Sequence, residues 1–154
     1  MTKPRNAEKL IKLDGLSLIA NVPKPTLAQR FDRRLYKLSR RDKSSNGSGT
    51  HKEFCRETII GISIAQRFIE LGVGIGPATA AAAQFTDNPS PGRRAGNLFC
   101  QDRTVLCIRQ GRPVVVNLPY DADFCDLADH GTAFVAVDCE MICKKLTKPS
   151  HKTI

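Results

Sequence analysis

The sequence predicts an α+β protein, with a mostly helical N-terminal part followed by a small, antiparallel, β-rich α+β part. Apolar residues recur at helical spacing in the first part, as at Leu27, Phe31 and Leu35, but form short runs typical of strands after residue 96. Charge is divided in the same way. Residues 1–67 carry 15 Lys or Arg and 6 Asp or Glu, whereas residues 68–154 carry 9 of each. We therefore expect the basic half to meet a polyanion.

Composition also suggests where the two parts meet. Residues 86–97, TDNPSPGRRAGN, contain prolines and glycines and no apolar period, which is typical of a linker or long loop. With 154 residues, the chain is long enough for one domain or two small ones. We expect four segments: a basic helical domain at 1–85, a linker at 86–95, a small α+β module for self-association or partner binding at 96–146, and a flexible tail at 147–154.

Several classes of protein do not fit the composition. No apolar run approaches the ~18–20 residues that cross a bilayer, and the N-terminus MTKPRNAEKL lacks the apolar core of a signal peptide. We therefore expect a cytoplasmic protein without a membrane partner. The six cysteines form no CxxC pair, so we expect small buried hydrophobes rather than metal or redox groups, and we predict no cofactor.

Two short helices are expected near the N-terminus. Asp14 can cap the first, Gly15–Ala20, because its carboxylate accepts hydrogen bonds from the free amides of the first turn. Asn21-Val22-Pro23 interrupts this helix, since Asn tolerates a left-handed backbone. Pro25 suits the first turn of the second helix. The buried side of that helix is expected to continue through Leu27, Phe31, Leu35 and Leu38.

Turn residues and apolar period predict the remaining elements. A flexible segment at 42–50, DKSSNGSGT, precedes a helix that starts near Phe54 and ends at Gly72. A further, alanine-rich helix starts at Pro77. The C-terminal elements are two strands at 104–110 and 112–119 that form a hairpin at Gly111, a helical turn within 121–131, and a strand at 132–146.

The first two predicted helices are joined by a short turn, and the second is basic. This is the arrangement of a helix-turn-helix, in which the second helix enters the major groove of DNA and flanking cations neutralise phosphates. Residues 24–43 hold eight Lys or Arg against Asp32 and Asp42. The alternative is an ordinary amphipathic helix with a solvated basic face.

A longer set of residues follows the spacing of a known family. First-helix positions are taken by Leu13, Leu16, Ser17 and Ile19, the turn by Asn21-Val22-Pro23, and the start of the next helix by Thr26-Leu27. Further on come a wing tip at Asn46-Gly47-Ser48-Gly49, an aromatic residue at Phe54, a helix start at Arg56-Glu57, and then Ile59, Ile62, Ala65 and Glu70–Ile75. Through these positions, residues 13–83 resemble the winged helix-turn-helix domain of MerR-like transcription regulators. The long dimerisation helix of that family is absent here.

The resemblance implies a sequence-specific regulator of transcription that binds double-stranded DNA, and a phage or mobile element is a candidate source. We expect a homodimer, because one short recognition helix reads few bases. The residues expected in or near the major groove are Lys24, Thr26, Gln29, Arg30 and Arg33, with Gln29 and Arg30 reading bases. The residues expected to touch phosphates are Arg34, Lys37, Arg40, Arg41, Lys43, His51 and Lys52.

Other chemistry is less well supported. Gly72–Pro77 is glycine-rich but follows a helix rather than a strand, so a phosphate-binding loop is not predicted. Cys139 and Cys143 would lie ~13 Å apart on a strand, too far for one metal ion. His130 lies among aspartates without a placed nucleophile, and we predict no enzymatic activity. Two competing hypotheses stay open: a basic adaptor that binds RNA or a partner such as RNA polymerase or the ribosome, and a ligand or metal sensor.

Overall fold

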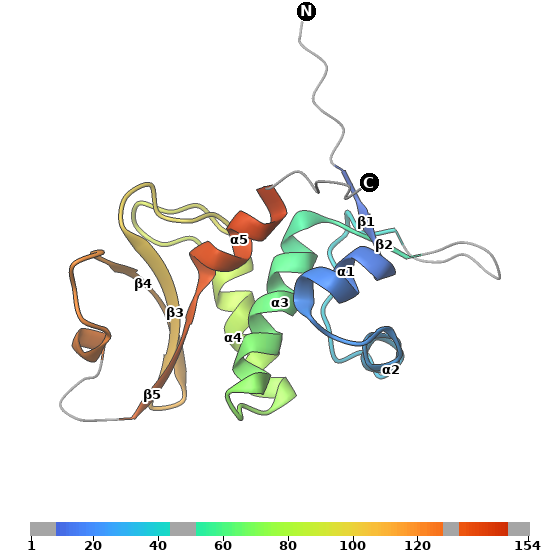
Figure 1. The fold of residues 1–154 in the computed structure, drawn as a ribbon, viewed down its shortest axis with the longest axis horizontal. Helices are drawn as coiled ribbons and strands as arrows, with labels where there is room; N and C mark the ends of the chain where they lie inside the picture. The colour runs from blue at the N-terminus through green and yellow to red at the C-terminus, as the bar shows by residue number, and fades with distance from the viewer. Residues whose placement is uncertain (1–8, 44–51, 128–132, 148–154) are drawn as a thin grey trace, which may run out of the picture.

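The computed structural model describes residues 9–43, 52–127 and 133–147, which form a mixed α+β structure (Figure 1). The first part of the chain contains β1 (Ile11–Lys12), α1 (Leu13–Ala20), α2 (Lys24–Asp32), β2 (Glu53–Phe54), α3 (Arg56–Glu70) and α4 (Ile75–Thr86). The second part contains β3 (Arg103–Arg109), β4 (Arg112–Leu118), the 3-10 helix η1 (Phe124–Leu127), β5 (Phe134–Asp138) and α5 (Cys139–Thr147). The predicted α+β class is confirmed, with two small antiparallel sheets among the described residues.

Helix α1 begins two residues earlier than predicted and is not capped by Asp14. The residue before the helix is Lys12, and Asp14 lies inside the first turn, where the helix dipole favours a carboxylate. Asn21 has the predicted left-handed backbone, with φ of 56°. Ser17 holds the turn that follows, because its carbonyl accepts a hydrogen bond from Val22 N–H at 3.1 Å and its hydroxyl donates to Val22 O at 2.6 Å.

Helix α2 ends at Asp32, so the predicted helical face through Leu35 and Leu38 is wrong. Arg34 has a left-handed backbone, with φ of 56°, and a right-handed helix cannot continue through it. Beyond this point the chain buries Tyr36, whose ring meets that of Phe31 edge-on with 5.3 Å between centroids. Tyr36 therefore fills the apolar position that helical spacing predicted for Leu35.

A small sheet joins the basic region to α3. Strand β1 pairs with β2, with Ile11 opposite Phe54. Lys43 also pairs with β2, because it exchanges two backbone hydrogen bonds of 2.9 and 3.0 Å with Glu53. The pairing brings together the two ends of the segment between Lys43 and Glu53. The predicted wing tip at 46–49 lies outside the described residues, as do His51 and residues 148–154 of the predicted tail.

Helix α3 lies between two hydrophobic clusters and is the central helix of the fold (Figure 1). One side buries Ile59 and Ile62 in a cluster with α1, α2 and β2. The other side buries Ile60 and Ile64 in a cluster with α4, α5 and the second sheet, which contributes Leu106. Helix α3 ends as predicted near Gly72, while α4 begins at Ile75, two residues before Pro77. The segments on either side of the predicted linker therefore share one hydrophobic core.

The second sheet has the strand order β4-β3-β5. The predicted hairpin is confirmed, because Gln110 and Gly111 have φ of 49° and 73°, the backbone of a two-residue type I′ turn. The predicted helical turn is present as η1, and residues 128–131 of that prediction lie outside the described residues. None of the described helices is long and apolar enough to cross a membrane.

The strand predicted at 132–146 is wrong in its second half, which is helical. Strand β5 ends at Asp138, and α5 begins at Cys139. The Asp138 carboxylate caps the new helix by accepting a hydrogen bond from Glu140 N–H at 2.9 Å. Buried residues then recur at helical spacing, at Cys139, Ile142 and Cys143. This stripe packs α5 into the same core as α3.

Residues of the predicted linker are held against α4 by a buried arginine. Arg93 is 5% exposed, and its guanidinium donates hydrogen bonds to Phe85 O at 3.0 Å and to Asn88 O at 2.6 Å. The guanidinium also lies 4.9 Å from the centroid of the Phe85 ring, a cation–π contact. These contacts fix the path of the chain where it leaves α4.

Candidate nucleic-acid interface

Helix α2 turns a polar face to solvent. Its apolar residues Leu27 and Phe31 are buried in the cluster with α1 and β2. On the outer side, Gln29 is exposed in the middle of the helix, and Thr26 is half-buried in its first turn. Amide and hydroxyl side chains can hydrogen-bond the edges of bases. Of the five predicted groove residues, Gln29 and Thr26 therefore stand where such contacts are possible.

Aromatic rings support the inner side of α2. Phe31 stacks on Phe54 of β2, with ring centroids 5.0 Å apart and planes 11° apart. Tyr36 packs edge-on against the Phe31 ring. The ammonium of Lys52, a predicted phosphate contact, lies 5.3 Å from the Phe31 centroid, and the residue is half-buried. Packing of this kind gives α2 a defined orientation on the rest of the domain.

Arg30 makes contacts that the sequence did not predict. Its Nη1 atom donates hydrogen bonds to Tyr36 Oη at 2.8 Å and to Gln66 Oε1 of α3 at 2.9 Å. The residue is half-buried. Arg30 therefore ties α2 to α3, whereas the sequence suggested that it reads bases.

Three arginines after α2 differ from Arg30 in being exposed. Arg33 follows Asp32, the last residue of the helix, Arg34 comes next, and Arg40 lies further along the same segment. Their side chains have no ion-pair or hydrogen-bond partner within the part of the chain that the structure describes. A free, exposed guanidinium is well suited to bind a phosphate.

Four other predicted cations have carboxylate partners. These ion pairs are Lys24 with Asp14, Lys37 with Asp87 at 3.2 Å, Arg41 with Glu57, and Lys43 with Glu53 at 3.8 Å. The three lysine side chains are more than half exposed. The carboxylates of Asp14 and Asp87 are exposed as well. Exposed ion pairs contribute only ~0–1 kcal/mol, so phosphates can replace these two carboxylates at little cost.

The pair between Arg41 and Glu57 is partly shielded from water, because the Glu57 side chain is 31% exposed. Burial alone would raise the pKa of Glu57, but the charge of Arg41 and hydrogen bonds to Arg41, the backbone and Cys55 together outweigh burial and lower the pKa. Glu57 is therefore ionised at neutral pH. It anchors the end of the basic segment to the first turn of α3.

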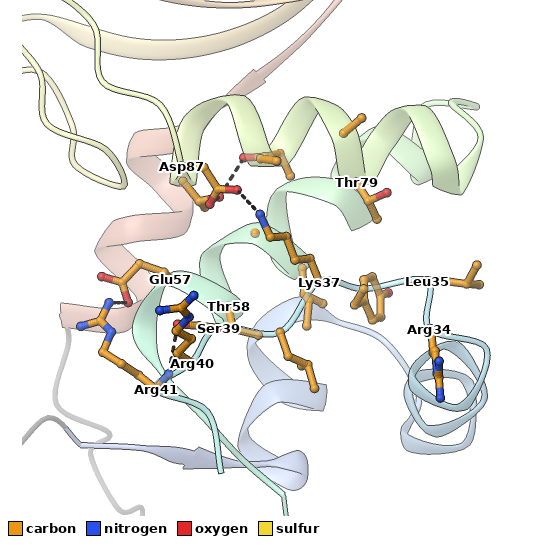
Figure 2. Close-up of a pocket in the computed structure, with 18 residues that line it drawn as sticks. Arg34, Leu35, Lys37, Ser39, Arg40, Arg41, Glu57, Thr58, Thr79 and Asp87 are labelled. Carbon is orange, nitrogen blue, oxygen red and sulfur yellow. Dashed lines mark hydrogen bonds and ion pairs between the residues drawn. The ribbon is translucent and has the colours of Figure 1, made fainter. Parts of the chain in front are cut away.

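A groove of about 730 Å³ lies between residues 34–41 and the two helices α3 and α4 (Figure 2). The basic side chains along it come from residues 34–41, and its floor includes Gly61 of α3 and Ala83 of α4. Sequence spacing does not reveal this groove, because it predicts that α2 continues through Leu35 and Leu38. The left-handed Arg34 frees the segment that forms one wall.

Two buried cysteines lie one helical turn apart on α5. Burial raises the pKa of both Cys139 and Cys143, so both thiols stay protonated at neutral pH. Within the described residues, no three His, Cys, Asp or Glu side chains come close enough to hold a metal ion. His130 and Asp129, considered above for hydrolytic chemistry, lie outside the described residues.

Comparison with known proteins assigns no family to the chain. No protein-family model matches it, and no match was found among the curated proteins. The resemblance to MerR-like regulators therefore stays a prediction from residue spacing. Function has to be inferred from the surface itself.

Proposed function

We propose that residues 11–86 form a winged helix-turn-helix that binds double-stranded DNA and regulates transcription. The observation that carries this proposal is the unit α1–turn–α2, in which a left-handed Asn21 joins two short helices and the second has an exposed polar face. The paired backbones of Lys43 and Glu53 supply the base that a wing at the intervening residues would need. The charge excess of the N-terminal half favours a polyanionic partner.

In this proposal, the outer face of α2 reads the bases. Gln29 is the main candidate, because a glutamine amide can form two hydrogen bonds to the major-groove edge of adenine. Thr26 is the second candidate. Arg30 becomes a positioning residue that holds α2 on α3 through Tyr36 and Gln66.

In this proposal, phosphates are bound by cations at the start of α2, at its end and in the segment after it. Arg33, Arg34 and Arg40 are ready to bind, because their guanidinium groups have no partner to release among the described residues. Lys24 and Lys37 can exchange exposed carboxylates for phosphates. The side chain of Lys43 is itself 70% exposed and lies 3.8 Å from Glu53.

The second sheet is the proposed region for self-association. Its outer strands, β4 and β5, have no further strand beside them within the described residues. A sheet of three strands leaves edges that another chain can cover. Two recognition helices in one dimer would double the number of base pairs read. Light scattering of the full chain at micromolar concentration tests this part, and a monomer would refute it.

Fluorescence anisotropy tests the class of partner. The full chain is titrated into a labelled duplex from beside its own coding sequence, a random duplex and a single-stranded RNA of equal length, in 50 mM salt. We expect tighter binding to duplex DNA than to RNA, and tighter binding to one duplex than to the random one. Binding to RNA alone would instead support the basic-adaptor hypothesis. Absence of duplex binding would remove the proposed function.

A further inference from the structure

The groove between residues 34–41, α3 and α4 has an excess of positive charge (Figure 2). Four cationic side chains line it: Arg34, Lys37, Arg40 and Arg41. The lining carboxylates are Glu57 and Asp87, each already ion-paired with one of those cations. The charge left over belongs to Arg34 and Arg40. An occupant that complements this lining is therefore an anion.

The floor of the groove is formed by small side chains, most of them apolar. Helix α4 contributes Thr79, Ala80, Ala82, Ala83 and Thr86, and helix α3 contributes Thr58, Gly61 and Ile62. The three threonine hydroxyls already donate hydrogen bonds within the chain: Thr58 to Asp42 Oδ2 at 2.6 Å, Thr79 to Ile75 O at 2.9 Å, and Thr86 to Asp87 Oδ1 at 3.0 Å. Such a floor offers van der Waals contact and few hydrogen bonds. It fits an apolar group.

The volume of the groove favours a small molecule over a larger partner as its occupant. Small-molecule pockets measure ~300–1,000 Å³ and combine an apolar lining with a few placed polar groups. The groove, at about 730 Å³, lies in that range. Its cations all lie on one wall, residues 34–41, while α3 and α4 contribute mostly small side chains.

We propose that this groove binds a small organic anion with an apolar body. The body lies against α3 and α4, and a carboxylate, sulfonate or phosphate group lies against the cations of residues 34–41. Arg40 is the main anion-binding residue, because it lines the groove and has no other partner among the described residues. The Lys37–Asp87 ion pair bridges the groove between residues 34–41 and α4. This ion pair breaks when the bound anion pairs with the Lys37 ammonium instead.

Anion binding also regulates DNA binding, a consequence that rests on the proposed function. Three of the cations that line the groove, Arg34, Lys37 and Arg40, are also proposed to bind phosphates. A bound anion neutralises them and competes with the DNA backbone. Because coupling between two ligands is reciprocal, DNA must weaken anion binding by the same factor as the anion weakens DNA binding.

The test uses 8-anilinonaphthalene-1-sulfonate, a fluorescent organic anion with an apolar ring system. We expect saturable binding to the full chain. Ala83→Leu, which fills the floor, and Arg40→Glu, which reverses a lining charge, should each weaken binding by about tenfold or more. Gln84→Leu is the matched control, because residue 84 is the next position on α4 and does not line the groove. Thermal melting followed by circular dichroism verifies that each variant is folded.

Each outcome decides the proposal. Equal binding by wild type, Ala83→Leu and Gln84→Leu would overturn it, and so would a lack of saturable binding. A third arm uses a labelled acidic amphipathic peptide. Groove-dependent binding of that peptide without binding of the dye would assign the groove to a protein partner and refute the small-molecule proposal.

A final arm separates this proposal from the proposed function. Saturating dye should weaken duplex binding by wild type and Gln84→Leu but not by Ala83→Leu. A chain that binds dye in the groove but no duplex refutes the proposed function alone. A chain that binds duplex but shows no groove-dependent dye binding refutes only the proposed anion site in the groove. Dye binding in the groove without any effect on duplex affinity refutes the proposed competition between anion and DNA.

Discussion

Replacing Arg30 with alanine is expected to loosen α2 without removing a phosphate contact. The Arg30 guanidinium donates to Tyr36 Oη and Gln66 Oε1, and both acceptors belong to the surface on which α2 rests. The alanine variant loses both hydrogen bonds. DNA affinity should fall for all sequences together, because the helix is less well oriented but its outer face is unchanged.

The size of the effect follows from the two hydrogen bonds. Each hydrogen bond from a charged donor contributes ~1.5–3 kcal/mol when buried. Arg30 is half-buried, so its acceptors recover part of this from water. We therefore expect a loss of about 2 kcal/mol in the free energy of unfolding for the pair. In a chain of this length that corresponds to a fall of about 4–8 °C in Tm.

Urea unfolding followed by circular dichroism measures the stability, and anisotropy with a duplex library measures base preference. Arg33→Ala is the matched control, because Arg33 is exposed and has no partner among the residues that the structure describes, so its loss should change stability by about 0.5 kcal/mol or less. Gln66→Ala added to Arg30→Ala should cost less than the sum of the two single changes. Native stability with altered base preference in Arg30→Ala would refute the positioning role and restore base reading.

Further predictions concern other residues. Gln29→Ala should lose about 1–3 kcal/mol of discrimination between base pairs while keeping its salt dependence, as measured with a duplex library. Arg93→Met should lower the free energy of unfolding by about 3 kcal/mol, because it leaves buried carbonyls without their donor; urea unfolding measures this. In thiol labelling read by mass spectrometry, buried Cys139 should react only on unfolding. Exposed Cys125, whose pKa Asp123 raises, should react faster at pH 8 after Asp123→Asn.

Each of these predictions has an outcome that would contradict it. A weaker salt dependence in Gln29→Ala would place this side chain on phosphates. Unchanged stability in Arg93→Met would mean that the segment after α4 is held by other contacts. Fast labelling of native Cys139 would contradict its burial, and equal rates for Cys125 in both variants would show that Asp123 does not control its ionisation.

Local chemistry made several elements predictable from sequence. Asn21 tolerates the left-handed turn between α1 and α2, and the Gln110-Gly111 pair allows both positive φ angles of the hairpin. Gly72 takes φ of 92° where α3 ends. In each case one or two neighbouring residues decide the backbone, so no distant contact has to be known.

Elements decided by distant contacts were not predictable. Leu35 continues the helical spacing of Phe31, yet the chain leaves the helix at Arg34 and buries Tyr36 against Phe31. The apolar run at 134–143 suits a strand, but its second half joins the α3 core as a helix. At both places tertiary packing, and not the local spacing of apolar residues, decided the secondary structure.

The candidate site was likewise predictable from sequence only in part. The basic character of residues 24–43 is visible in composition, and the exposure of Gln29 follows from the burial of Leu27 and Phe31. The partner of Arg30 could not be foreseen, because Gln66 lies 36 positions away in the sequence. The groove depends on the same long-range folding, since its walls come from residues 34–41, α3 and α4.

The salt dependence of duplex binding tests the central claim most directly. The affinity of the full chain is measured between 50 and 200 mM salt for wild type, the triple variant Arg33→Ala/Arg34→Ala/Arg40→Ala, and Arg112→Ala, which removes an exposed cation from β4. We expect the logarithmic slope of the triple variant to be shallower than wild type by about 2.7, near 0.9 for each lost phosphate contact, and that of Arg112→Ala to be unchanged. A triple variant with the wild-type slope would contradict DNA binding by this surface.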